Sequence, residues 1–418
     1  MRRWRPLLRA IGATALTLAL AVEIFRVHAA DRLAVRDPAA ALGFDGRNAA
    51  AATLAAQNAL ATAKPDFPKV AAALRSLLAI DPLAPGALAV LGAAQAQTGD
   101  LATARRTMTI AAAHLPVDLL AQGWLYERAI ATNDVGAAVD RLDLLLRGRP
   151  FIAEKAAPSV ARLLAIGPAA EAALAKRLAP APPWRKWLLE RLPLDAPQSA
   201  PVVRLYDRLS AAGAPVGPDE LRPLLWRLLR DGAAQEAQRA WRASLPPELR
   251  SSAPLLFNAD LRRTPANLPF DWETPPLPGS AVAFDPRAGA IVVDFYGGRT
   301  PFAHLRHVLA LPPGPYVFAG RESADNLQTP RGLRWTIACL DAPGALLGAG
   351  GLLAGDRTDA PFSIAFETPA QGCPAQILTL ALDARIESET EISGTARFTA
   401  LSLTRGGAPG GATPDTPR

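Results

Sequence analysis

The sequence contains few lysines, histidines and cysteines, and each shortage excludes a class of function. Only five of its 45 basic residues are lysines, and the excess of arginine accompanies abundant alanine, as high-GC codon usage produces. No dense basic run with interleaved aromatic residues is present, so the net charge of +7 does not indicate a nucleic-acid partner. The four histidines and two cysteines have no close spacing typical of a metal site, and no metal is expected.

Motifs of common enzyme classes are also missing. The chain has no Gly-x-Ser-x-Gly nucleophile elbow. The run Gly348-Ala349-Gly350-Gly351 follows no strand–helix pattern, so we interpret it as a turn between strands rather than a dinucleotide loop. The sequence therefore predicts a non-enzymatic protein with no catalytic residues and no cofactor.

The N-terminus resembles an export signal. Four arginines at positions 2, 3, 5 and 9 precede an uncharged stretch from Ala10 to Val22, which has the length of a signal-peptide core. In one interpretation, residues 1–29 are cleaved near Ala29 and the body is released into the periplasm. In the other, which we prefer, Leu7 to Phe25 remains as an inner-membrane anchor with the body in the periplasm. The basic flank carries the body across the membrane in both cases.

The two cysteines, Cys339 and Cys373, lie in the C-terminal third. In an exported protein such a pair is most simply a disulfide, and the alternative is two buried free thiols. The bridge would close a span of 34 residues and stabilise the fold by roughly 3–4 kcal/mol on chain-entropy grounds.

Residues 35–250 are rich in alanine and leucine, with turn signals at a regular spacing. In the unit 85–118, Leu88 and Leu91 are large, Gly92 is small, and Gly99-Asp100 marks a turn. Prolines and aspartates recur every 34 residues. They are Pro82, Pro116, Pro150, Asp66, Asp100 and Asp134.

This period and pattern resemble tetratricopeptide repeats, in which two antiparallel helices form each unit. The resemblance is specific over residues 51–152 and loose over 153–250, where prolines interrupt the register. It implies an α-solenoid over residues 35–250 that binds a protein partner in its groove. The alternative is a rigid spacer, because a fold alone does not define a function.

After residue 247 the pattern changes to short strands separated by proline and glycine. Alternation is clearest in 333–339, where Trp335 shares a face with Leu333 and Cys339 and is predicted to lie in the core. This spacing is typical of an all-β sandwich or jelly roll. The expected strands are 281–285, 290–296, 303–311, 315–321, 333–340, 361–367, 375–383 and 396–404.

Several motifs in this region carry a family resemblance. They are Phe257-Asn258-Ala259-Asp260-Leu261, Pro269-Phe270-Asp271-Trp272, the Leu-Pro-Pro-Gly-x-Tyr turn at 311–316, and the closing Gly394-x-Ala396-x-Phe398. Together, residues 255–404 resemble jelly-roll carbohydrate-binding modules of the galactose-binding type, which follow repeat arrays in bacterial proteins associated with surface polysaccharide. The chain departs from the family at Arg262 and Thr399, where acidic residues often serve a structural calcium, so no such site is expected.

The resemblance implies a sugar site in which aromatic rings and planar hydrogen-bonding side chains project from one face or edge. The candidates are Trp272, Tyr296, Arg306, Arg321 and Arg334. The alternative is that the aromatic residues pack in the core or rim and the arginines are solvated surface.

The sequence thus predicts an α-then-β multidomain protein with an N-terminal membrane segment (1–29), a repeat array (35–250), a β-sandwich (255–404) and a disordered tail (405–418). We expect an accessory or scaffold protein for cell-surface polysaccharide, whose array binds a protein and whose sandwich binds a glycan. The alternative is a purely structural protein-interaction module that binds no sugar.

Overall fold

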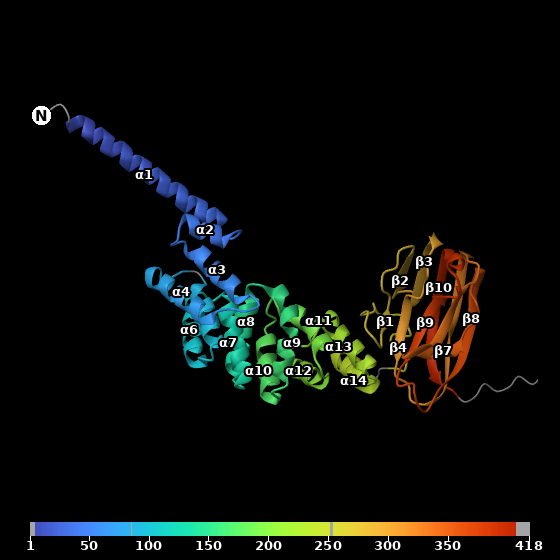
Figure 1. Ribbon diagram of the computed structural model, residues 1–418. Coiled ribbons are helices and arrows are strands. Elements are labelled where there is room, and N and C mark those ends of the chain that lie inside the picture. The colour runs from blue at the N-terminus through green and yellow to red at the C-terminus, as the bar shows by residue number, and fades with distance from the viewer. Residues whose placement is uncertain (1–4, 85, 251–253, 407–418) are drawn as a thin grey trace, which may run out of the picture. The chain divides into compact units, whose positions relative to one another are not determined.

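The computed structural model describes residues 5–84, 86–250 and 254–406, and it confirms the order of helices first and strands second (Figure 1). The expected tail falls mostly on residues 407–418, which lie outside the described residues. The helices are α1 (Arg5–Leu33), α2 (Pro38–Phe44), α3 (Ala49–Leu60), α4 (Phe67–Ile80), α5 (Ala87–Gln97), α6 (Leu101–His114), α7 (Leu119–Ala131), α8 (Val135–Arg147), η1 (Pro150–Ile152), α9 (Ala153–Leu164), α10 (Pro168–Leu178), α11 (Arg185–Asp195), α12 (Ala200–Ala211), α13 (Pro218–Arg230), α14 (Ala234–Ser244) and α15 (Pro247–Arg250).

The strands follow without an intervening long helix. They are β1 (Trp272–Glu273), β2 (Ser280–Asp285), β3 (Ala290–Arg299), β4 (Leu305–Leu309), β5 (Gly314–Gln328), β6 (Leu333–Cys339), β7 (Ala342–Ala349), β8 (Gly355–Thr368), β9 (Gln376–Leu382) and β10 (Glu391–Arg405), with a 3₁₀ turn η2 (Glu387–Thr390) before the last strand.

The 34-residue period marks one helix start and one helix end in each unit. The carboxylates of Asp66, Asp100 and Asp134 each accept a hydrogen bond from the backbone N–H three residues later, and so cap the N-termini of α4, α6 and α8. The three periodic prolines come two or three residues after the last residue of the same helices, where proline cannot continue a helix. Local chemistry therefore sets the repeat boundaries.

A small residue allows the helices of one unit to approach closely. Gly92 on α5 faces Met108 on α6, and a Cβ added at Gly92 would lie 2.9 Å from the Met108 Cγ. Met108 is fully buried, so it has little room to move away. The glycine is thus required by packing between α5 and α6.

The chain forms two compact units whose boundary lies within the helices. The first unit contains residues 1–153, 166–177 and 182–184, and the second contains 154–165, 178–181 and 185–418. The second unit therefore includes α11 to α14 together with the strands. None of the helices built from the described residues combines the length and hydropathy that a bilayer crossing demands.

The strands form two antiparallel five-stranded sheets, which confirms the predicted β-sandwich (Figure 1). We call the sheet with the order β1-β4-β9-β6-β7 sheet A and the sheet with the order β2-β3-β10-β5-β8 sheet B. The prediction of a turn at residues 348–351 was wrong in part, because Gly348 and Ala349 belong to β7 and pair with Ile337 and Thr336 of β6.

Aromatic side chains join the two sheets in one core. Trp335 of sheet A lies 5.4 Å from Phe318 and 5.2 Å from Phe398 of sheet B, measured between ring centroids, in edge-to-face arrangements. Trp272 of β1 packs on Trp335, with the two ring centroids 5.9 Å apart. The prediction that Trp335 is a core residue is confirmed.

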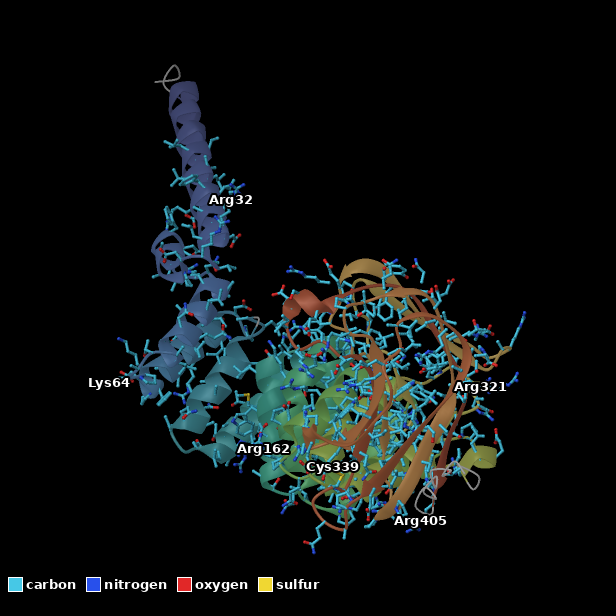
Figure 2. The ribbon with its side chains drawn as sticks, turned by 90° about the vertical axis from the view of Figure 1, so that its right-hand side faces the viewer. Arg32, Lys64, Arg162, Arg321, Cys339 and Arg405 are labelled. Carbon is cyan, nitrogen blue, oxygen red and sulfur yellow. A yellow bond between two sulfur atoms is a disulfide. The ribbon has the colours of Figure 1, made fainter. Side chains whose placement is uncertain are left out.

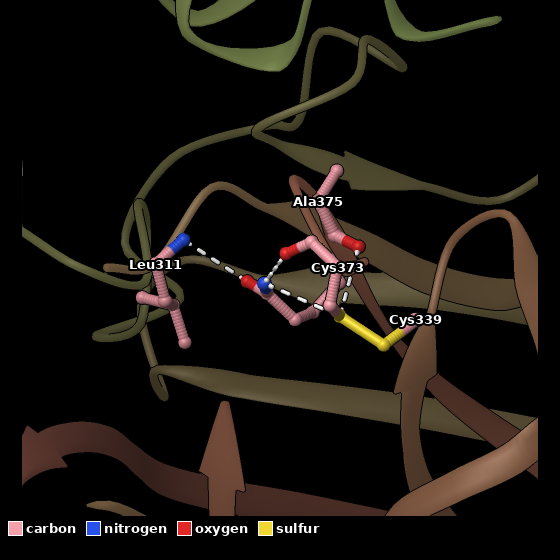
Figure 3. Close-up of a disulfide and its surroundings, with 5 residues drawn as sticks. Leu311, Cys339, Cys373 and Ala375 are labelled. Carbon is pink, nitrogen blue, oxygen red and sulfur yellow. Dashed lines mark hydrogen bonds between the residues drawn. A yellow bond between two sulfur atoms is a disulfide. The ribbon is translucent and has the colours of Figure 1, made fainter. Parts of the chain in front are cut away.

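The predicted disulfide between Cys339 and Cys373 is present, with Cα atoms 5.3 Å apart (Figure 3). The buried side chain of Gln376 holds the loop before β9: its Nε2 donates to the Cys373 carbonyl and its Oε1 accepts from the Leu311 N–H, both at 2.9 Å. The disulfide and the Gln376 side chain together connect the end of β6 to the loop before β9 and to the loop between β4 and β5.

Removal of the disulfide is expected to destabilise the protein by about 3–4 kcal/mol, because the unfolded chain regains the entropy of a 34-residue loop. Urea denaturation of the Cys339→Ala, Cys373→Ala double variant measures the loss. A reductant should lower the midpoint of the parent protein towards that of the variant. An unchanged parent midpoint after confirmed reduction would contradict this account.

Two helical glycines provide a matched test of the repeat packing. Gly123→Ala on α7 meets open space and should stabilise by about 0.5–1 kcal/mol through helix propensity. Gly92→Ala gains the same propensity but must displace Met108, so it should destabilise by about 1–2 kcal/mol. Chemical denaturation of both variants measures the difference, and equal shifts would show that α5 and α6 are not closely packed at Gly92.

Candidate functional site

The outer face of sheet B is open and polar. On β3, Ile291, Val293 and Phe295 point into the core, so the alternating residues Val292, Asp294 and Tyr296 point outward. Tyr296, at the end of this row, is 70% exposed. Such exposure is unusual for a tyrosine in a small sandwich, whose aromatic residues mostly fill the core.

The central strand β10 continues this face. Ala396 and Phe398 are buried, so Thr395, Arg397 and Thr399 alternate outward. Thr395 Oγ1 donates to Asp294 Oδ1 of β3 at 2.7 Å, and Arg397 pairs with Val292 and Ser323 in the strand register. Within the described part of the chain, the Arg397 guanidinium forms neither an ion pair nor a hydrogen bond. Its donors are therefore free to bind a ligand.

Arg321 (Figure 2) lies midway along β5 on the same face and pairs with Thr399 of β10 in the strand register. Its Nε donates to Asp359 Oδ1 at 2.6 Å, and both side chains are exposed. Six residues along β10 separate the register positions of Tyr296 and Arg321, which corresponds to roughly 20 Å. A ligand that contacts both residues must be an extended chain.

The outer face of sheet A is partly covered by a helix. The Arg306 guanidinium lies over the ring of Trp226 from α13, 5.2 Å from its centroid. Trp226 Nε1 also donates to Glu273 Oε1 at 3.3 Å. Burial raises the pKa of Glu273, and the neighbouring Arg306 opposes that rise. Arg306 thus stabilises the contact between α13 and sheet A.

The remaining predicted site residues lie elsewhere. Arg334 is on sheet A and pairs with Asp383 at 2.6 Å. Trp272 is fully buried beside Trp335, and its Nε1 donates to the Asn258 carbonyl. A ring without exposed surface offers no face to a sugar, so the structure assigns Trp272 to the core instead of to a ligand surface.

The structure therefore places two of the five predicted site residues, Tyr296 and Arg321, on one face, about 20 Å apart, and adds Arg397 between them, which sequence reasoning missed. A signal for Arg397 was present in the closing motif, because inward Ala396 and Phe398 require the residue between them to point outward. Hydroxyls on this face donate or accept hydrogen bonds, carboxylates accept them, and the Tyr296 ring offers a flat apolar surface. Within the described ranges, no cluster of three or more metal-ligating side chains occurs.

The comparisons with known proteins add little to this geometry. No family model matches the chain, and no curated protein matches it. A solved structure titled "CBM4 structure and function" is similar at 13% identity and covers 32% of this chain and 86% of its own, with a TM-score of 0.25. At this identity and score the likeness does not define a function, so the assignment depends on the residues of this chain.

A buried histidine lies under Trp272 in the same sandwich. His307 of β4 packs edge-to-face on Trp272 with ring centroids 5.1 Å apart, and its Nδ1 lies 2.8 Å from the Val308 carbonyl oxygen. Burial lowers the pKa of His307 to about 4, because the charged imidazolium would lose its hydration.

The stability of the fold is expected to fall as the pH is lowered from 7 to 5. In this range the unfolded chain protonates His307 near its ordinary pKa of about 6.5, whereas the folded chain keeps it neutral. The loss from this group is about 2 kcal/mol at pH 5. Urea titrations at both pH values measure it, and a His307→Leu variant should lose less stability than the parent. Equal losses would argue against a buried neutral histidine.

Proposed function

We propose that this is an exported accessory protein for extracellular polysaccharide, in which the outer face of sheet B binds a glycan chain and the helical repeats bind a protein. The main observation in support of glycan binding is the open polar face of sheet B. It places the exposed side chain of Tyr296 at the end of the outward row on β3, the unpaired guanidinium of Arg397 on the central strand, and Arg321 midway along β5.

The chemistry of this face suits a sugar chain. A pyranose ring presents an apolar C–H surface that packs on an aromatic ring, and its hydroxyls take hydrogen bonds from planar groups such as guanidinium. Thr395 and Asp294 between Tyr296 and Arg321, and Thr399 beside Arg321, add hydroxyl and carboxylate partners. The separation of about 20 Å along β10 favours an oligosaccharide over a monosaccharide.

Two further features support the remaining parts of the proposal. The disulfide supports an extracytoplasmic location, because such bonds persist mainly in oxidising compartments. The periodic N-caps support repeats of the tetratricopeptide type, whose grooves bind protein segments. N-terminal sequencing of the purified protein would distinguish cleavage near Ala29 from retention of residues 1–29 as an anchor.

One observation favours a second function, that of a purely structural interaction module without sugar binding. Helix α13 covers part of the outer face of sheet A through Trp226, Glu273 and Arg306. A sandwich of this kind serves as a rigid end to the helices. We prefer the glycan-binding proposal because the opposite face stays open and contains an exposed aromatic ring that packing does not explain.

Titration of the full-length protein with the surface polysaccharide of its host, followed by calorimetry, tests the glycan proposal. We expect saturable binding that Tyr296→Ala and Arg397→Ala each weaken at least tenfold, since loss of a stacked ring or of a charge-assisted hydrogen bond is worth about 1.4 kcal/mol or more.

The matched control is Arg334→Ala, which removes an arginine that is half-buried, as Arg397 is, from sheet A and should change affinity less than twofold. Urea midpoints of all variants verify that each remains folded. Two results would refute the proposal: no saturable heat with the folded parent protein, or equal losses for Arg334→Ala and Arg397→Ala.

A further inference from the structure

A hollow lies in the first compact unit, between helices α6, α7 and α8 of the repeats. It has a volume of about 260 Å³. Its apolar lining includes Leu101 of α6 and Leu125 and Ala129 of α7. None of its lining residues belongs to the open face of sheet B.

Three arginines, one from each helix, line the hollow: Arg105 of α6, Arg128 of α7 and Arg141 of α8. The only acidic residue in its lining is Asp134, whose carboxylate is engaged as the N-cap of α8. The lining therefore has a clear excess of positive charge, and an anionic group is the ligand that complements it.

The arginines differ in how they are held. Arg141 Nη1 donates to Gln122 Oε1 at 2.9 Å, and Gln122 is itself buried and bonded to the Pro116 carbonyl. In the part of the chain that the structure describes, Arg105 and Arg128 form no ion pair and no side-chain hydrogen bond. Hence one guanidinium is fixed in position, while the other two have all their donors available.

The size and lining of the hollow decide between classes of anion. Whole small-molecule ligands occupy pockets of roughly 300–1,000 Å³, so about 260 Å³ suits one or two side chains of a larger partner. No aromatic ring lines the hollow, which disfavours a sugar chain. Apolar residues beside arginines match a protein segment that alternates apolar and acidic side chains.

We infer that the hollow formed by α6, α7 and α8 binds an acidic segment of a partner protein, with glutamate or aspartate carboxylates on Arg105 and Arg128 and apolar side chains against Leu101 and Leu125. The inference rests on the protein-binding half of the proposed function and specifies the chemistry of that partner.

The test uses the full-length protein and a fluorescein-labelled hexapeptide that alternates leucine and glutamate, with fluorescence anisotropy as the readout. We expect saturable binding that weakens at least tenfold when glutamine replaces each glutamate of the peptide. Arg105→Gln and Arg128→Gln should each weaken binding about tenfold, because each removes charge-assisted hydrogen bonds to a carboxylate. Binding should also weaken as salt is raised from 50 to 500 mM.

Arg106→Gln is the matched control. Arg106 is the next residue on α6, is exposed, donates to Thr103 Oγ1, and lies outside the hollow, so its loss should change affinity less than twofold. Inorganic phosphate and polygalacturonate serve as competitors for other anion classes, and neither should displace the peptide at millimolar charge concentration.

Several results would overturn the inference: no peptide binding up to 2 mM with folded protein, equal binding of the glutamine peptide, an Arg106→Gln effect as large as that of Arg105→Gln, or displacement by polygalacturonate. The calorimetric glycan titration on the same preparation separates the two hypotheses. Glycan binding without peptide binding refutes only the acidic-segment inference, whereas peptide binding without glycan binding refutes only the proposal for sheet B.

Discussion

The packing of Trp335 between the two sheets is the interaction on which the rest of the sandwich depends. Its ring contacts Phe318 of β5 and Phe398 of β10 in the opposite sheet. These contacts define which side of β5, β6 and β10 faces the core. Because side chains alternate along a strand, each inward residue fixes the direction of its neighbours. Arg397 points outward because Ala396 and Phe398 fill the core, and the open face of sheet B is thus a consequence of core packing.

The helical repeats and most strands could be predicted from the sequence because their signals are local. An aspartate that caps a helix and a proline that follows one act within a few residues, and both recur every 34 residues. β7 could not be predicted in the same way. Its glycines resemble a turn, but a Cβ on Gly348 would lie 2.9 Å from the Phe366 Cβ, so the glycine is required by contact with β8.

The site was predictable in residue type but not in position. Aromatic and arginine side chains are the chemistry that the proposed sugar site requires, yet their location depends on strand register and on what covers each face. Trp272 lies in a two-residue strand that the sequence pattern did not indicate, and its ring enters the core. Arg306 packs against Trp226 of α13, which is distant in sequence, so its guanidinium is not available to a ligand. Neither contact has a local signature.

The open face of sheet B and the hollow of the repeats differ in charge balance, and this difference separates the ligands that we propose for them. On sheet B, Arg397 has Asp294 as a diagonal neighbour and Arg321 is paired with Asp359, so the field is nearly neutral and suits hydroxyl groups. In the repeats, Arg105 and Arg128 form no ion pair among the described residues, and the single carboxylate in the lining of the hollow, that of Asp134, caps α8. Under the acidic-segment inference, a partner that covers the apolar lining also desolvates these two guanidinium groups, and its carboxylates offset part of that cost.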